Sequence, residues 1–129
     1  MTVVAQVLVG LVALLHSWFL VLEMFLWTTP TGRRTFGLER DFAEQTRTLA
    51  ANQGLYNGFL AAGLIWGLLY RDRRVGRHIQ LFFLGCVAVA GVYGAYSAKF
   101  SILFVQALPA AIAGSLVVLV RSRAENSAA

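Results

Sequence analysis

Apolar runs of about twenty residues alternate with short charged stretches along this chain. An α-helix rises about 1.5 Å per residue, so about twenty apolar residues cross the hydrocarbon core of a bilayer. With short links between the runs, the pattern predicts an all-α membrane protein: four antiparallel transmembrane helices in an up-down bundle. The predicted spans cover residues 3–27, 49–70, 79–98 and 101–120.

The connections between these spans carry residues that end helices or prefer water. Pro30 and Gly32 follow the first span, and we expect them to stop its helix. Residues 28–48 form the one long connection, where apolar positions at helical spacing predict an amphipathic helix or an extension of the second span. Pro109 predicts a kink in the fourth span, and residues 121–129 form a polar tail.

Composition supports a membrane location for the single domain formed by residues 1–129. Hydrophobic residues make up 58% of the chain and charged residues only 13%, and the mean hydropathy is +0.67. Soluble domains carry about 25% charged residues, so this chain has too little polar surface to cover itself in water. The lipid bilayer is therefore the partner that the composition predicts.

The net charge of +5 does not indicate a nucleic-acid partner, because the cations stand where membrane helices end. The N-terminal apolar run has no basic segment before it, which favours a retained helix over a removed signal peptide. Arginines in short loops favour the cytoplasmic side, so we expect an inner-membrane protein with both termini in the cytoplasm. The arginines that follow apolar spans are Arg71, Arg73, Arg74, Arg77, Arg121 and Arg123.

Glycines in the second span predict close helix packing. Gly54 and Gly58 form one small-xxx-small pair, and Gly63 and Gly67 form another on roughly the opposite face at 100° per residue. The second helix should therefore contact neighbours on both sides. The same small faces would also allow a homo-oligomer.

Polar side chains inside the spans are the candidates for a functional site. Ionisable and amide groups cost free energy at membrane depth unless they are paired. Placed by helical rise, they fall at the midplane or in the half of the bilayer that faces residues 28–48. This segregation predicts a polar, ligand-binding pocket in one leaflet. Its candidate residues are His16, Glu23, Asn52, Gln53, Tyr56, Asn57, Tyr93, Tyr96 and Gln106.

Each of these side chains also has a purely structural interpretation. His16 could be a neutral imidazole bonded to another helix, and the amides could simply join helices. Glu23 could reach water or pair with Lys99 or with an arginine of residues 28–48. His16 and Glu23 share a helix face but lie about 10 Å apart along the axis, so they cannot bind one metal ion. No metal or cofactor is predicted, and Cys86 should pack as a small apolar side chain.

Two stretches carry a family resemblance: "LEMFLWTTPTGRRTFGL" at residues 22–38 and "LAANQGLYNGFLAAGLIWGL" at residues 49–68. They resemble a bacterial family of small integral membrane proteins designated domain of unknown function 1304. The resemblance implies a four-helix inner-membrane protein and carries no established activity with it. The motif positions that it transfers are Glu23, Asn52, Gln53, Tyr56 and Asn57.

Three functions follow from these observations, and the chain contains no nucleophile elbow, phosphate loop or dinucleotide motif that would select an enzyme class. The first is binding or transport of a small ligand at the polar pocket. The second is a membrane enzyme acting on a lipid or quinone, with His16 or Glu23 as general acid or base and Tyr93 or Tyr96 as donors. The third is a scaffold that packs against other proteins through its glycine faces.

Overall fold

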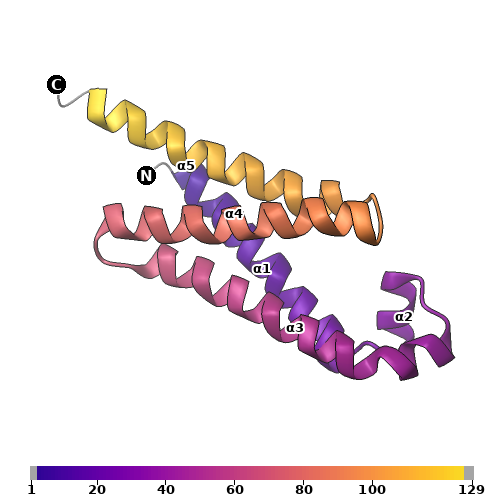
Figure 1. The fold of residues 1–129 in the computed structure, drawn as a ribbon. Coiled ribbons are helices and arrows are strands. Elements are labelled where there is room, and N and C mark those ends of the chain that lie inside the picture. Colours follow the sequence, from indigo (N-terminus) through magenta and orange to yellow (C-terminus); the bar gives the residue numbers. More distant parts are fainter. Residues whose placement is uncertain (1–2, 127–129) are drawn as a thin grey trace. The chain divides into compact units, whose positions relative to one another are not determined.

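The computed structural model describes the backbone of residues 3–126 and the side chains of residues 3–119 (Figure 1). This part of the chain contains helices joined by short turns and no strand, which confirms the all-α prediction. The elements are α1 (Val3–Phe25), α2 (Pro30–Phe36), α3 (Arg40–Leu69), α4 (Arg73–Ser97), a π-helical turn η1 (Leu103–Ala107) and α5 (Leu108–Asn126).

Two of the helices, α1 and α4, are long and apolar enough to cross a membrane. Only 28% of the apolar window of α1 and 22% of that of α4 are buried, whereas the core helix of a soluble protein is mostly buried. The structure therefore supports two of the four predicted spans. α3 is long enough, but the amides of Asn52, Gln53 and Asn57 lower its hydropathy. Among the residues with described side chains, Leu103–Leu119 forms a further, shorter apolar helical stretch.

The helices extend past the predicted apolar spans into their charged flanks. α3 begins at Arg40, and α4 begins at Arg73. The start of α4 is capped by Asp72, whose carboxylate accepts hydrogen bonds from the backbone N–H groups of Arg74 at 2.8 Å and Val75 at 3.3 Å. Such a cap satisfies backbone donors at a helix start, so the helix does not need apolar residues there.

Pro30 and Gly32 do more than end the first helix. α1 stops at Phe25, and Pro30 then occupies the start of the short helix α2, where its missing N–H group is not needed. The Thr29 hydroxyl caps this helix by accepting a hydrogen bond from the N–H group of Gly32 at 3.3 Å. Gly32 lies so close to the carbonyl group of Leu26 that no side chain fits there.

The chain forms two compact units. The first unit comprises Met1–Ala13 and Ala62–Ala129, and the second comprises Leu14–Ala61. Helices α1 and α3 each contribute residues to both units.

In the second unit, the C-terminal part of α1 packs antiparallel to α3. A Cβ atom on Gly54 would lie 2.7 Å from Met24 Cγ, and one on Gly58 would lie 2.5 Å from Leu20 Cδ1. These glycines therefore let the two helices approach closely. Within this unit, the buried positions of α3 are separated by seven, four, three and four residues, as in a helix-packing seam. They are Ala43, Ala50, Gly54, Asn57 and Ala61.

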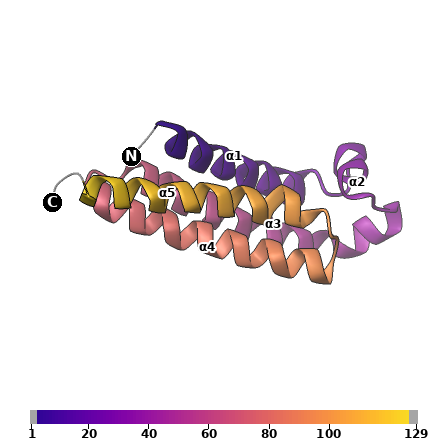
Figure 2. The same cartoon turned by 90° about the horizontal axis from the view of Figure 1, so that it is seen from above.

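Trp27, which follows α1, contacts both α2 and α3. Its indole Nε1–H donates to Thr46 Oγ1 of α3 at 3.1 Å, and its ring lies 4.9 Å from the ring of Phe36 in α2. Figure 2 shows α2 as a short helix beside the start of α3. The connection predicted over residues 28–48 thus contains the separate helix α2 and the first turns of α3, which extend the predicted second span toward its N-terminus.

In the first unit, consecutive helices run antiparallel, and α4 and α5 lie side by side in both views (Figures 1 and 2). Gly63 packs against the ring of Phe83, and Gly67 packs against Gly76 at the start of α4. The glycines of α3 therefore contact α1 with one pair and α4 with the other, as their spacing predicts.

A π-helical turn lies just before Pro109, where the sequence predicts a kink. The N–H group of Leu108 bonds to the carbonyl group of Leu103, five residues back. Pro109 has no N–H group to donate to Val105, so a regular α-helix would leave that carbonyl without its usual partner. The irregular turn lies against α4, where Gly91 faces Ala107.

Candidate functional site

The clearest polar contact between helices joins Glu23 of α1 to Asn57 of α3. The Asn57 Nδ2–H group donates to Glu23 Oε2 at 2.7 Å. Asn57 is only 6% exposed, while Glu23 is half-buried. The close approach at Gly54, one helical turn before Asn57, brings the two side chains within reach. We call these two residues the Glu23–Asn57 pair.

The pair leaves two oxygen atoms available. A carboxylate can only accept hydrogen bonds, so the amide N–H group must face Glu23 and the amide carbonyl must point elsewhere. Within the described part of the chain, neither Glu23 Oε1 nor Asn57 Oδ1 takes part in a hydrogen bond. The pair therefore presents one charged and one neutral acceptor, which suits a ligand that donates hydrogen bonds.

The remaining polar residues of α3 lie apart from this pair. Asn52, Gln53 and Tyr56 are exposed, and the Tyr56 ring contacts Phe59 with centroids 6.2 Å apart. Tyr56 and Asn52 lie about 100° and 140° around the helix from Asn57, so they face away from the buried seam. Of the four residues predicted on this helix, the structure brings only Asn57 to Glu23.

His16 lies on the part of α1 that belongs to the second unit. Its side chain is fully buried, and its ring meets the Phe19 ring edge-on with centroids 5.8 Å apart. It lies on the same face of α1 as Glu23 but about 10 Å away along the helix, because seven residues separate them. The structure therefore does not join His16 to the Glu23–Asn57 pair.

The other predicted residues belong to the first unit. Tyr93 is 70% exposed and Tyr96 is 91% exposed on α4, where both line a shallow apolar groove. Gln106 lies in the π-helical turn, and its Nε2–H group donates to the carbonyl oxygen of Val87 at 3.5 Å. This long hydrogen bond connects the turn to α4.

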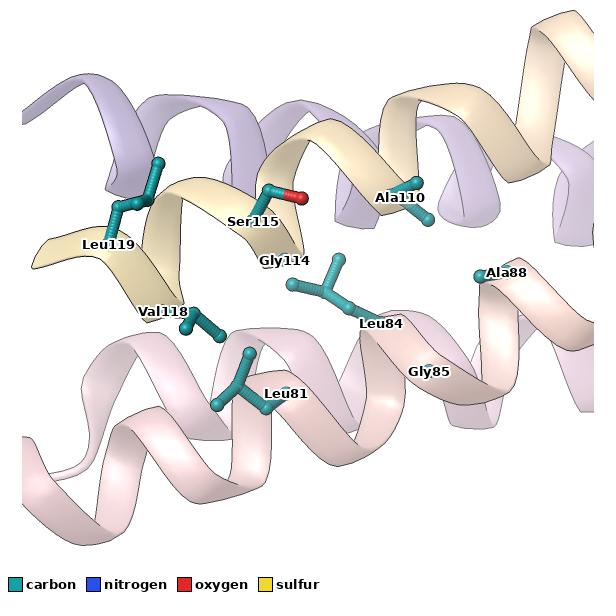
Figure 3. A pocket seen from close by; sticks show the side chains of 10 residues that line it. Leu81, Leu84, Gly85, Ala88, Ala110, Gly114, Ser115, Val118 and Leu119 are labelled. Carbon is teal, nitrogen blue, oxygen red and sulfur yellow. The ribbon is translucent and has the colours of Figure 1, made fainter. Parts of the chain in front are cut away.

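A larger groove of about 580 Å³ lies between α4 and α5 (Figure 3). Ser115 supplies its one polar side chain, and the rest of its lining is aliphatic or glycine. A lining of this kind contacts hydrocarbon well but offers no charged group to a polar ligand. The groove is lined by Leu81, Leu84, Gly85, Ala88, Ala110, Ala111, Gly114, Ser115, Val118 and Leu119.

Gln80 is a buried polar residue that the sequence analysis missed. It is 1% exposed, and its Nε2–H group donates to the carbonyl oxygen of Gly67 at 2.8 Å. It stands directly after the arginine-rich turn, where polar residues are expected on the surface. The helical spacing of the buried residues of α4 could have identified it: Gly76, Gln80, Leu84, Val87 and Gly91.

Side chains that commonly bind metals do not gather in the part of the chain that the structure describes. No three His, Cys, Asp or Glu side chains lie together there in an arrangement that could hold an ion. Cys86 carries a free thiol and is partly buried on α4. The carboxylate and the amide of the Glu23–Asn57 pair therefore define the chemistry of the candidate site.

Comparison with known proteins places these residues in a family. The family model described as "Protein of unknown function (DUF1304)" matches residues 10–118, a range that includes the Glu23–Asn57 pair. The uncharacterized protein YpaA of Lactococcus lactis subsp. lactis (strain IL1403) is 30% identical over 108 residues, which cover 82% of this chain and 89% of that protein. No solved structure gives a significant match. The chain therefore belongs to the DUF1304 family.

Proposed function

We propose that this protein is a multi-pass protein of the cell inner membrane, with four spans and cytoplasmic termini, that binds a small ligand at the Glu23–Asn57 pair. The exposed apolar surfaces of α1 and α4 support the membrane location. The length of α3 and the apolar stretch Leu103–Leu119 support the two further spans.

The observation that carries the ligand-binding proposal is the carboxylate of Glu23 within the apolar helix α1. A carboxylate in an apolar environment is costly, and one amide N–H group offsets only part of that cost. Two neutral amides could join the helices without a charge. The presence of a carboxylate with an open oxygen therefore favours a ligand-binding role over a purely structural one.

The available atoms also define the class of ligand. Glu23 Oε1 belongs to a carboxyl group that carries negative charge when ionised, and Asn57 Oδ1 is a second acceptor in the same pair. A primary ammonium group donates up to three hydrogen bonds and supplies the opposite charge. We therefore propose a small amphiphilic ligand with a protonated amine as the binding partner.

The test is a thermal-melting assay of the detergent-solubilised protein with hexylammonium. Ligand binding stabilises the folded state by about 2.7 kcal/mol at a hundredfold excess over Kd, so the melting temperature should rise. Hexyltrimethylammonium has the same charge but no N–H donors, and it should raise the melting temperature less. The proposal is wrong if hexylammonium shifts wild type and Glu23→Gln equally.

A scaffold role is the competing function, and the burial of Asn57 in a tight helix seam favours it. Glu23→Gln distinguishes the two, because a glutamine keeps a hydrogen-bonding partner for Asn57 but removes the charge. A scaffold would keep its stability and its protein partners in this variant. A transporter would lose substrate-driven proton flux in proteoliposomes.

A further inference from the structure

The turn between α3 and α4 carries an unusual density of positive charge. Residues 70–78 read "YRDRRVGRH" and contain four arginines and one acidic residue. Residues 70–75 are exposed, and so is His78. This arginine turn lies within the first unit, whereas the Glu23–Asn57 pair belongs to the second.

The single acid of the turn does not neutralise the arginines. The Asp72 carboxylate caps α4 by accepting hydrogen bonds from the backbone N–H groups of Arg74 and Val75. Within the described residues, the guanidinium groups of Arg71, Arg73 and Arg74 make neither an ion pair nor a hydrogen bond. Three exposed guanidinium groups are therefore available to an anionic partner.

Aromatic side chains mark the position of this turn relative to a bilayer. Trp66 and Tyr70 are 55% and 39% exposed at the end of α3, and their ring centroids lie 6.0 Å apart. Tryptophan and tyrosine are enriched at the boundary between hydrocarbon and headgroups. The arginines begin at the next residue, Arg71. Apolar, aromatic and cationic side chains thus follow each other along the chain in the same order as the hydrocarbon core, the interface and the headgroups of a bilayer.

We propose that the arginine turn binds the phosphate groups of anionic phospholipids in the cytoplasmic leaflet. Guanidinium groups bind phosphate oxygens through paired, charge-assisted hydrogen bonds, and the negative leaflet attracts basic segments beside a membrane helix. This inference rests on the membrane location proposed above but is independent of the ligand at Glu23.

The test compares lipid retention by the full-length protein in native mass spectrometry. Protein reconstituted in mixed phosphatidylglycerol and phosphatidylcholine is transferred to mild detergent, and the retained lipids are counted. Wild type should retain phosphatidylglycerol preferentially. In the variant Arg71→Gln/Arg73→Gln/Arg74→Gln, the ratio of retained phosphatidylglycerol to phosphatidylcholine should fall at least about tenfold. The control Arg34→Gln/Arg40→Gln/Arg47→Gln removes three exposed arginines elsewhere and should keep it.

Three results would overturn the inference. The first is equal retention of the two lipids by wild type. The second is an equal loss of preference in both triple variants, which would indicate a general charge effect. The third is displacement of the lipid by millimolar inorganic phosphate, which would indicate a site for free phosphate. If the protein instead stays dispersed in water without detergent, the proposed membrane location is wrong as well. Circular dichroism spectra that match wild type verify that each variant folds.

Discussion

Two hydrogen bonds between helices, one in each unit, show different uses of a polar side chain. In the first unit, Gln80 is almost fully buried and donates to the backbone carbonyl group of Gly67 at 2.8 Å. In the second unit, Asn57 donates to the carboxylate of Glu23 at 2.7 Å, and that carboxylate is half-buried. Both bonds join antiparallel helices at a close glycine contact.

The partners explain the difference between the two bonds. The carbonyl group of Gly67 is fixed in the backbone, and its bond to Gln80 joins two uncharged groups. The carboxylate of Glu23 is ionisable and keeps an oxygen that accepts no hydrogen bond from the described residues. We therefore expect changes at the Gln80–Gly67 bond to lower stability alone, and changes at the Glu23–Asn57 pair to affect ligand binding as well.

The largest effect on stability is expected for Gly76→Ala. A Cβ atom there would lie 2.6 Å from the carbonyl oxygen of Gly67, and only a backbone shift could relieve that overlap. Overpacking of this kind costs about 1–3 kcal/mol, measured as the free energy of unfolding in detergent. Gly85→Ala on the same helix is the control, because its Cβ atom would meet nothing within 4 Å. Equal losses in the two variants would contradict the close packing of α3 on α4.

Gln80→Leu should have a smaller effect. Leucine fills a similar volume but removes the hydrogen bond to Gly67. Such bonds contribute about 0.6–2 kcal/mol in membrane helices, and the near-complete burial of Gln80 favours the upper part of that range. The free energy of unfolding should fall by about that amount, while stabilisation by hexylammonium should stay at the wild-type value. Loss of the hexylammonium effect in this variant would show that the two units do not have the separate roles described above.

The smallest stability effects are expected for single amides of α3. Asn57→Ala removes the bond to Glu23 and should lower the free energy of unfolding by about 0.6 kcal/mol, the average for such bonds in a membrane protein. Asn52→Ala changes an exposed side chain and should stay within about 0.5 kcal/mol of wild type. Chemical unfolding of both variants checks this ranking. A larger loss of unfolding free energy in Asn52→Ala than in Asn57→Ala would contradict the assignment of Asn57 to the helix seam.

The sequence predicted those features that depend on a single helix. The all-α fold and the two glycine faces of α3 follow from apolar run length and from a period of 100° per residue. The sequence could not predict that Asn57 is buried while Gln53 is exposed, because this difference depends on the register of α1 against α3. That register is set by contacts such as Gly58 with Leu20, which are distant in sequence.

Other features were missed for related reasons. Gln80 follows a charged turn, and its burial depends on the close approach of Gly67 and Gly76. The π-helical turn depends on how the chain before Pro109 meets Gly91 of α4. The helical spacing of Gln80 with Leu84 and Gly91 places it on the buried face of α4, and Pro109 indicates an irregular helix, but neither pattern specifies the contact itself.

The most direct test of the central claim is native mass spectrometry of small molecules that co-purify with the protein. Wild type, Glu23→Gln and Gln80→Leu are purified identically in mild detergent. We predict that wild type and Gln80→Leu carry the same bound molecule and that Glu23→Gln has lost it. Identical spectra for wild type and Glu23→Gln would contradict the assignment of Glu23 as the ligand-binding group.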